Sequence, residues 1–356
     1  MTVAIATPIL NDGDAIGHDV LGMANALRAD GHDVRFFAEK ARVDEDVFPL
    51  ADLADFLRHG DNAVIYHHSL RCDTAVRAVE RYPHQAVVKF HNVTPPRFFT
   101  DVNPEAVPDC EVGRQQAIRL ARSGVPFWVD SAFNARDLAD DVPTLRSEEL
   151  PPFHQAETLL RTTPDADNLG GLDNWAPTLL CVGRVAPNKN LELAVETLAE
   201  LRDPHARLVL AGEHVYADYS DRVLKRAESL GVAGSLVVTG HVSTAQLKAL
   251  YLASDLLLVT SDHEGFCVPL VEAMVLGVPI VGVPRTAVPD TGGDAVRYAN
   301  DAPTLANAVR EVIDDSPTRE RHLRAGRRRY RERFSQTAIA ARFRELFARQ
   351  FAACAV

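Results

Sequence analysis

The sequence predicts an α/β protein built from two Rossmann-like, doubly wound domains, and three observations support this fold class. Short apolar runs alternate with amphipathic helical stretches along the chain, a pattern typical of parallel sheets with helical connections. The chain has 356 residues, more than a single hydrophobic core usually organises. Between the two alternating halves, residues 143–176 are rich in proline and carry the pair Gly170-Gly171, as interdomain segments often do.

The first half alternates regularly between strands and helices. A turn-rich loop, Asn11–Gly17, follows the first apolar run, and Gly31 ends the first helix. The strands expected are Val3–Ile9, Val34–Phe37, Ala63–Tyr66, Ala86–Phe90 and Phe127–Val129, with helices near Asp19–Arg28, Leu50–Arg58, Asp73–Arg81 and Cys110–Arg122.

The second half repeats the pattern and ends in helices. Its expected strands are Leu179–Val182, Leu208–Ala211, Leu236–Thr239, Leu256–Val259 and Ile280–Val283. Thr304–Asp314 and the arginine-rich Arg319–Arg333 read as helices. In the last helix, one face carries the apolar residues Ile339, Phe343, Leu346, Phe347 and Phe351.

The composition excludes several classes of protein. Apolar residues make up 46% of the chain and charged residues 24%, as in ordinary globular proteins. A net charge of −11 argues against a general nucleic-acid binder. The five cysteines are widely spaced, which predicts reduced thiols and a cytoplasmic location. We expect no signal peptide, and no apolar run approaches the roughly 18 residues of a membrane span.

The stretch 255–283 reads as a strand, a polar loop, a helix and a further strand. Glu264 lies in the loop, Pro269 stands at the expected helix start, and Glu272 follows about one turn later. Carboxylates in such a loop can accept hydrogen bonds from sugar hydroxyls, and a helix N-terminus can hold an anion. The alternative is a pair of solvated surface acids.

A second loop follows the strand Leu179–Val182 and reads Gly183-Arg184-Val185-Ala186-Pro187-Asn188-Lys189-Asn190. Two cations at the carboxyl end of a strand, before a helix, suit a diphosphate. Taken together, the two loops resemble the donor half of retaining glycosyltransferases of family GT4. The family pattern, a Gly-Arg loop with a later Lys and a Glu-x7-Glu loop, corresponds to Gly183-Arg184, Lys189, Glu264 and Glu272.

The resemblance implies a GT-B fold, with two domains facing across a cleft and the C-terminal helix crossing back to the first domain. The implied boundaries are 1–165 for the acceptor domain, 166–334 for the donor domain and 335–356 for the last helix. An ordinary C-terminal helix on its own domain is the alternative.

The resemblance also implies roles in the donor domain. Arg184 and Lys189 hold the diphosphate, Glu264 contacts the donor sugar, and Glu272 accepts from the ribose. The family usually has glycine where this chain has Cys267. The segment Gly240-His241-Val242 would meet the nucleobase, or it is a plain strand-end turn. The other implied donor contacts are Gly183, Gly265, Phe266, Val268, Pro269 and Leu270.

In the first domain, the resemblance assigns His91 to the donor sugar near the reaction centre. Gly17 would approach the donor phosphates closely, or its turn is a helix cap made by Asp14. The segment 91–96 resembles that of a bacterial subgroup acting on saccharide, lipid-linked or aminocyclitol acceptors. The acceptor-side candidates are Asp14, His67, His68, Asn92 and Thr94.

The implied function is retaining sugar transfer from a nucleoside-diphosphate sugar, a UDP-sugar in preference to a GDP-sugar, to a hydroxyl group. We expect no metal and no cofactor, because cations and helix N-termini can stabilise the leaving diphosphate. The nucleotide-sugar is a substrate. A sugar phosphorylase and a non-catalytic binding relative are the alternatives. A nicotinamide-dependent dehydrogenase is disfavoured, because no Gly-x-Gly-x-x-Gly follows the first strand.

The arginine-rich stretch Arg319–Arg333 raises the alternative of peripheral membrane contact. Glu320 and Glu332 interrupt it, which favours a solvated helix.

Overall fold

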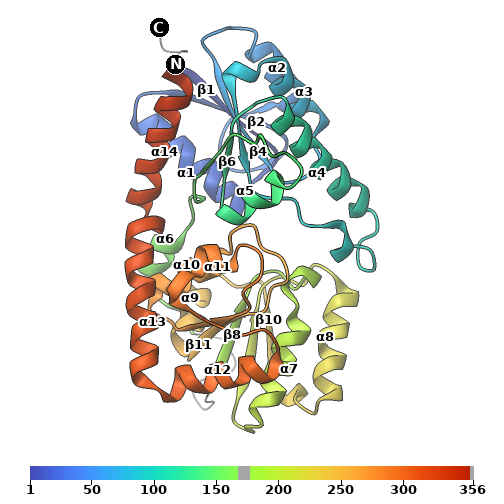
Figure 1. Ribbon diagram of the computed structural model, residues 1–356, viewed down its shortest axis with the longest axis vertical. Helices are drawn as coiled ribbons and strands as arrows, with labels where there is room; N and C mark the ends of the chain where they lie inside the picture. Colours follow the sequence, from blue (N-terminus) through green and yellow to red (C-terminus); the bar gives the residue numbers. More distant parts are fainter. Residues whose placement is uncertain (167–176, 353–356) are drawn as a thin grey trace. The chain divides into compact units, whose positions relative to one another are not determined.

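The computed structural model describes residues 1–166 and 177–352, and its contacts divide the chain into two compact units (Figure 1). Unit 1 consists of Met1–Arg97, Glu105–His154 and the segment from Ser335 onward. Unit 2 consists of Phe98–Pro104 and Gln155–Phe334. Each unit is an α/β fold around one parallel sheet, as the sequence predicts.

Unit 1 is built on a seven-stranded sheet in the order β3-β2-β1-β4-β5-β6-β7, and all its strand pairs are parallel. The strand order reverses between β1 and β4, so the sheet is doubly wound. The short strands β3 and β7 were not among the expected elements. The strands are β1 (Thr2–Asn11), β2 (Asp33–Arg42), β3 (Val47–Pro49), β4 (Ala63–His68), β5 (Ala86–Phe90), β6 (Phe127–Val129) and β7 (Ser147–Glu149).

Helices cover both faces of this sheet, and an apolar cluster lies under each layer. The central strands β4 and β5 are buried along their whole length, which explains the apolar runs Ala63–Tyr66 and Ala86–Val88. The helices are α1 (Ala15–Ala29), α2 (Leu53–Phe56), α3 (Asp73–Arg81), α4 (Ala106–Arg122), α5 (Ala132–Ala139) and α14 (Gln336–Phe351).

The C-terminal helix α14 belongs to unit 1, which confirms the expected return of the chain to the first domain. The Phe343 ring lies 5.8 Å from that of Trp128 and 6.0 Å from that of Phe153, centroid to centroid. All five residues of the predicted apolar face are buried in the same cluster: Ile339, Phe343, Leu346, Phe347 and Phe351.

Unit 2 contains a six-stranded parallel sheet in the order β10-β9-β8-β11-β12-β13, again doubly wound. Here the order reverses between β8 and β11, which are neighbours in the sheet. The strand β13 was not predicted. The strands are β8 (Thr178–Val182), β9 (Arg207–Ala211), β10 (Leu236–Gly240), β11 (Leu256–Val259), β12 (Ile280–Gly282) and β13 (Val296–Tyr298).

Two apolar clusters again lie on the two faces of the sheet. The predicted helix Arg319–Arg333 is α13 followed by a π-helical turn at Tyr330–Phe334, after which the chain returns to unit 1. The helices are α6 (Ala156–Arg161), α7 (Leu191–Leu201), α8 (Ala217–Ser229), α9 (Thr244–Ala253), α10 (Val268–Leu276), α11 (Val288–Gly292), α12 (Ala302–Asp314) and α13 (Ser316–Arg329).

A short segment from the first half of the sequence, Phe98–Pro104, belongs to unit 2. The Phe99 ring lies 6.1 Å from that of Tyr216, and Val102 packs against an apolar cluster of the sheet. No feature of the sequence pattern predicted this excursion, because the segment contains no strand and, apart from Phe98 at the end of a 3₁₀ turn, no helix.

Candidate functional site

The two loops singled out in the sequence meet at the switch point of the unit 2 sheet. One loop follows β8 and the other follows β11, and parallel neighbouring strands bring their carboxyl ends to the same edge. Lys189 and Glu264, which are 75 residues apart in sequence, are therefore close enough to bond. Ligands of open α/β sheets bind at this kind of position.

The loop after β8 is shaped around Lys189. Gly183 has a φ of 133°, and a Cβ there would lie 3.2 Å from Lys189 Cε, so glycine lets the lysine cross the loop closely. A single 3₁₀ turn, Pro187–Lys189, ends at Asn190 in the left-handed conformation. The Asn190 side chain accepts from Leu193 N–H and caps α7. Arg184 is exposed at the start of the loop.

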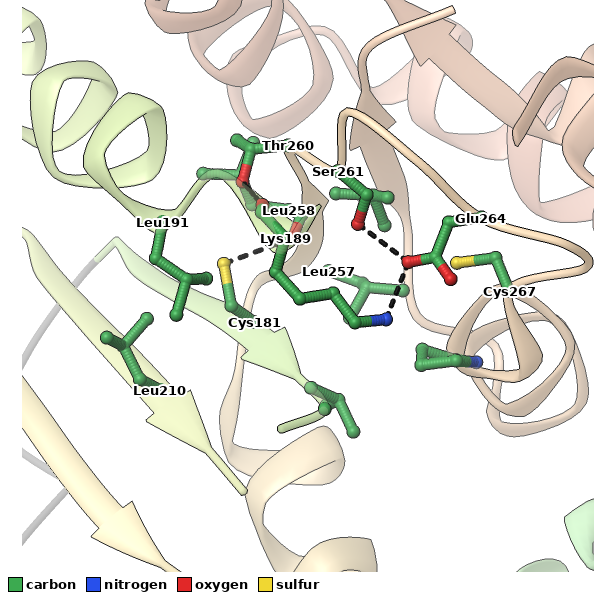
Figure 2. Close-up of a pocket in the computed structure, with 14 residues that line it drawn as sticks. Cys181, Lys189, Leu191, Leu210, Leu257, Leu258, Thr260, Ser261, Glu264 and Cys267 are labelled. Atoms are coloured by element: carbon green, nitrogen blue, oxygen red, sulfur yellow. Dashed lines mark hydrogen bonds and ion pairs between the residues drawn. The ribbon is translucent and has the colours of Figure 1, made fainter. Parts of the chain in front are cut away.

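Lys189 forms an ion pair with Glu264, with 2.6 Å between Nζ and Oε1 (Figure 2). Both side chains are largely buried, exposed by 19% and 10%. Burial alone would lower the pKa of Lys189, but Glu264 outweighs it and the pKa is raised, so the lysine is a fixed cation. The hydroxyl of Ser261 donates to the same carboxylate oxygen at 2.7 Å, and Glu264 N–H donates to Thr286 Oγ1 at 2.9 Å.

Thr286 is one of the few non-glycine residues with a positive φ, 51°. The Thr286 hydroxyl accepts from Glu264 N–H and so holds the loop that carries Glu264.

Cys267 is buried and adopts a left-handed conformation, with φ 75° and ψ 71°. This conformation costs a non-glycine residue roughly 1–2 kcal/mol, which explains why glycine suits the position. Cys267 is the N-cap residue of α10, with Val268 and Pro269 in the first turn, and its carbonyl accepts from Leu270 N–H at 3.1 Å. The helix therefore starts at the expected place.

A hollow of about 380 Å³, including open space at its mouth, lies beside the ion pair. Figure 2 shows Lys189 and Ser261 converging on Glu264 beside the sulfur of Cys267. Of the sequence-predicted donor residues, this hollow brings together Gly183, Lys189, Glu264, Cys267 and Pro269.

Glu272 lies one turn into α10 and is held by Tyr251, a residue that the sequence analysis missed. The Tyr251 hydroxyl donates to Glu272 Oε2 at 2.8 Å, and the ring is fully buried. Burial raises the pKa of Glu272, an effect that the tyrosine bond partly opposes. Tyr251 sits on α9, a helix in which an aromatic residue reads simply as core, so no local signal marked it.

The remaining donor candidates are more dispersed. Gly240 ends β10 with a φ of 71°, and the next residues are an exposed His241 and a half-buried Val242. The Phe266 ring packs 5.5 Å from that of Phe334, centroid to centroid, so this side chain is part of the core. The Phe266 carbonyl accepts from the Thr291 hydroxyl at 2.6 Å. Gly265 and Leu270 lie in the loop and first turn of α10.

In unit 1, His91 follows β5 and is bonded on both ring nitrogens. Nδ1 lies 2.9 Å from Asp130 Oδ2, and Nε2 lies 2.9 Å from His67 Nδ1. Lys89, two residues earlier, is fully buried and paired with Asp130. A lysine in the middle of the apolar strand Ala86–Phe90 was the available sequence signal for this network.

The other unit 1 candidates are mostly engaged within the fold. Asp14 caps α1 by accepting from Gly17 N–H at 2.7 Å, which is the capping alternative considered for this turn. A Cβ on Gly17 would lie 1.7 Å from the Asn11 carbonyl oxygen, so the backbone itself requires glycine there. The helix begins at Ala15, earlier than the sequence pattern suggested.

Three acceptor-side candidates are buried. His67 and His68 are fully buried, and His68 bonds the Tyr66 hydroxyl and the Gly113 carbonyl. Asn92 has a φ of 72°, and its side chain donates to Asn134 Oδ1 at 3.0 Å. Thr94 is half-buried in the following loop.

Comparison with known proteins places this fold and these loops in one class. The sequence profile of the family described as "Glycosyl transferases group 1" matches residues 168–329, which include both loops. Escherichia coli O-antigen chain mannosyltransferase B is 25% identical over 289 residues, covering 76% of this chain and 68% of that protein. Matches to other curated relatives span less than half of their length, 44% and 40% in two cases.

Two solved structures have the same fold over nearly the whole chain. Sucrose-phosphate synthase from Thermosynechococcus elongatus aligns with a TM-score of 0.77 at 18% identity, covering 99% of this chain and 100% of that one. Anabaena Alr3699/HepE, in complex with UDP, aligns with a TM-score of 0.74 at 16% identity, covering 98% and 100%.

The architecture is therefore that of the GT-B class, two Rossmann-like units with a returning C-terminal helix. Within that class, residues 168–329 match the group 1 glycosyl transferases, family GT4. Among the described residues, no helix has the length and apolar character needed to cross a bilayer.

Proposed function

We propose that this protein is a retaining glycosyltransferase that moves a sugar from a nucleoside-diphosphate sugar to an acceptor hydroxyl. The observation that carries the proposal is the Lys189–Glu264 pair at the unit 2 switch point, beside the start of α10. A fixed cation and a helix N-terminus suit a leaving diphosphate, and a carboxylate suits the hydroxyls of the sugar.

The ion pair also suggests how the site accepts its donor. The Lys189 ammonium and the Ser261 hydroxyl both bond Glu264 Oε1. A diphosphate approaching Lys189 would compete with the Glu264 carboxylate for the ammonium, because the same cation can stabilise either anion. Glu264 would then be available to accept hydrogen bonds from the sugar. The pair thus keeps a nearly buried lysine neutralised until the donor arrives.

The donor is proposed to be a UDP-sugar, with a GDP-sugar as the alternative. Support for the nucleotide comes from Anabaena Alr3699/HepE, which was solved in complex with UDP. Glu272, held by Tyr251, would accept from the ribose hydroxyls. Arg184, exposed beside Gly183, would supply a second cation to the diphosphate. The acceptor is proposed to be a saccharide, a lipid-linked sugar or an aminocyclitol.

The experiment that tests this function is a donor-consumption assay with UDP-glucose, UDP-galactose, GDP-mannose and ADP-glucose. We expect release of the free nucleoside diphosphate with one donor, slowly with water and faster with an acceptor. The anomeric configuration of the product, determined by NMR, should match that of the donor. Release that requires inorganic phosphate would instead identify a phosphorylase, and nucleotide-sugar binding without any release would identify a non-catalytic relative.

A further inference from the structure

Five ionisable side chains from four elements of unit 1 meet in one buried network. His67 lies near the carboxyl end of β4, and Lys89 lies in β5. His91 is the first residue after β5, and Asp130 is the first residue after β6. These three strands are adjacent in the sheet, and Asp19 approaches from α1. The side chains of Asp19, His67 and Lys89 are fully buried, and those of Asp130 and His91 are exposed by only 5% and 7%.

One side of the network fixes a proton on His91 Nδ1. The Lys89 ammonium pairs with Asp130 Oδ1 and also donates to the Leu150 carbonyl at 2.5 Å. The other oxygen of Asp130 lies 2.9 Å from His91 Nδ1. Burial would raise the pKa of Asp130, but His91 and Lys89 outweigh it and the pKa is lowered. An ionised Asp130 only accepts, so His91 Nδ1 must carry the hydrogen.

The other side fixes the proton between the two imidazoles. His67 Nδ1 and His91 Nε2 are 2.9 Å apart, so one of them donates. His67 Nε2 is buried and has no partner among the described residues. A buried N–H without an acceptor is more costly than a bare ring nitrogen, so His67 carries its proton on Nδ1. His67 then donates to His91 Nε2, and His91 is neutral with its proton on Nδ1.

Asp19 sets the charge of the network. Its Oδ1 accepts from Phe153 N–H at 2.8 Å, whereas Oδ2 is buried and unbonded among the described residues. Oδ2 lies 3.7 Å from Lys89 Nζ, 3.8 Å from His67 Nδ1 and 3.9 Å from His91 Nε2. With both imidazoles neutral, two carboxylates and one ammonium leave one negative charge in excess, and a proton on the Asp19 carboxylate restores neutrality.

Asp19, His67 and His91 also bring three potential metal-ligand atoms within 4.8 Å of one another. A divalent ion there would have to break the His67–His91 bond and sit near the Lys89 ammonium. It would also leave a positive charge in excess, whereas a proton balances the network. The geometry therefore favours proton binding over metal binding.

We propose that His67, Lys89 and Asp130 are positioning residues that hold His91 neutral, with its proton on Nδ1. The catalytic part rests on the proposed function and on the contact with the donor sugar that the family resemblance implies for His91. The sugar carbon becomes positively charged during transfer, so a neutral imidazole backed by Asp130 is favourable and an imidazolium is not. The bonds to Asp130 and His67 also prevent the ring from rotating.

The first test measures the tautomer in the wild-type chain. Two-bond ¹H–¹⁵N spectra of the ¹⁵N-histidine-labelled full chain, with His91→Gln to assign the signals, report which ring nitrogen carries the proton. At pH 7.5 we expect protonated Nδ1 and bare Nε2 for both His67 and His91. A proton on His91 Nε2, alone or together with Nδ1, would overturn the proposal. So would a stoichiometric metal retained on dialysis and lost in His67→Leu, measured by plasma mass spectrometry.

The second test asks whether the network matters for catalysis. His67→Leu removes the donor to His91 Nε2 and should lower kcat at least tenfold with the donor KM within about threefold. His67→Gln keeps an N–H donor and should recover most of that loss. Asp19→Asn removes a negative charge beside His91, so the acidic limb of the kcat/KM profile should move to lower pH. Unchanged kcat in His67→Leu together with an unmoved acidic limb in Asp19→Asn would overturn the proposal.

The two proposals can fail separately. If the wild-type protein transfers no sugar and consumes no donor, the proposed function fails, and the spectra still decide the state of the network. If transfer is confirmed but the spectra show an imidazolium, only the positioning proposal fails. Should His67→Leu not fold, the spectra of the wild-type chain remain decisive.

Discussion

Replacing Tyr251 with phenylalanine isolates one hydrogen bond in the proposed nucleotide site. The ring is fully buried, so the variant keeps the packing and loses only the hydroxyl. That hydroxyl donates to Glu272 Oε2 at 2.8 Å and lies 3.3 Å from the Pro269 carbonyl. Without it, Glu272 can adopt other rotamers, and the ribose must order the side chain when it binds.

The magnitude follows from the bond that is lost. A hydrogen bond to a charged group contributes about 1.5–3 kcal/mol, and ordering a free glutamate side chain costs up to roughly 2 kcal/mol. Because the tyrosine bond is present in both the free and the bound states, only the ordering part enters the affinity. We therefore expect a loss of about 1.4 kcal/mol, a tenfold weaker Kd for the nucleoside diphosphate.

The assay is isothermal titration calorimetry with UDP, or with the diphosphate that the donor screen identifies. The matched control is Tyr298→Phe in the same unit, whose hydroxyl lies 3.4 Å from the Val288 carbonyl; its Kd should stay within twofold. In a Glu272→Gln background, Tyr251→Phe should add less than twofold. A Kd within twofold of wild type for Tyr251→Phe alone would refute the role of Tyr251 in orienting Glu272.

Four further predictions concern single groups. Glu264→Gln should lower kcat by roughly 10²–10³-fold while the donor Kd changes less than tenfold, because the lost interaction strengthens as charge develops; equal losses in kcat and affinity, from initial rates and calorimetry, would contradict this. Dialysis against EDTA should leave the transfer rate unchanged, and a loss reversed by Mn²⁺ would show that a metal replaces the fixed cations. Cys267→Gly should stay within about 1 kcal/mol of wild-type stability, because glycine adopts the left-handed conformation without strain. Cys267→Val should lose at least about 2 kcal/mol in urea unfolding, because a β-branched residue is strained at this φ of 75°. The reverse order of stability would be inconsistent with that φ. Burial raises the pKa of Asp19 from 3.8 to about 6, so between these values the folded state retains a proton that the unfolded chain has released, and stability falls as pH rises. The unfolding free energy of wild type relative to Asp19→Asn should therefore drop by about 2 kcal/mol from pH 4 to pH 6, and a flat difference would exclude the shift.

Much of the fold could be predicted because the buried strands are local and apolar. The expected strands Ala63–Tyr66 and Ala86–Phe90 are buried on both faces, and their mainly apolar composition is typical of strands in a parallel sheet. The start of α10 was predictable from Pro269 and Gly277. By contrast, Ser147–Glu149 has no apolar pattern, and its half-buried side chains give no signal for an edge strand.

The residues of the site that belong to a sequence motif could be predicted. The residues that only hold those motif residues in place could not. Lys189 and Glu264 follow apolar strands, so the topology of a parallel sheet brings them together. Tyr251 and Asp130 act through contacts between distant segments, and a single sequence does not record such contacts. His67 illustrates the same difficulty: the sequence suggested an acceptor-side residue, whereas the structure buries it in a network. Burial depends on packing by other elements, which the sequence around His67 does not reveal.

The decisive experiment is a crystal structure of the protein soaked with its UDP-sugar. We expect diphosphate density against Lys189 and the first turn of α10, with Glu264 released from the lysine and bonded to the sugar. Density elsewhere in unit 2, or an intact Lys189–Glu264 pair in a fully occupied complex, would contradict this expectation.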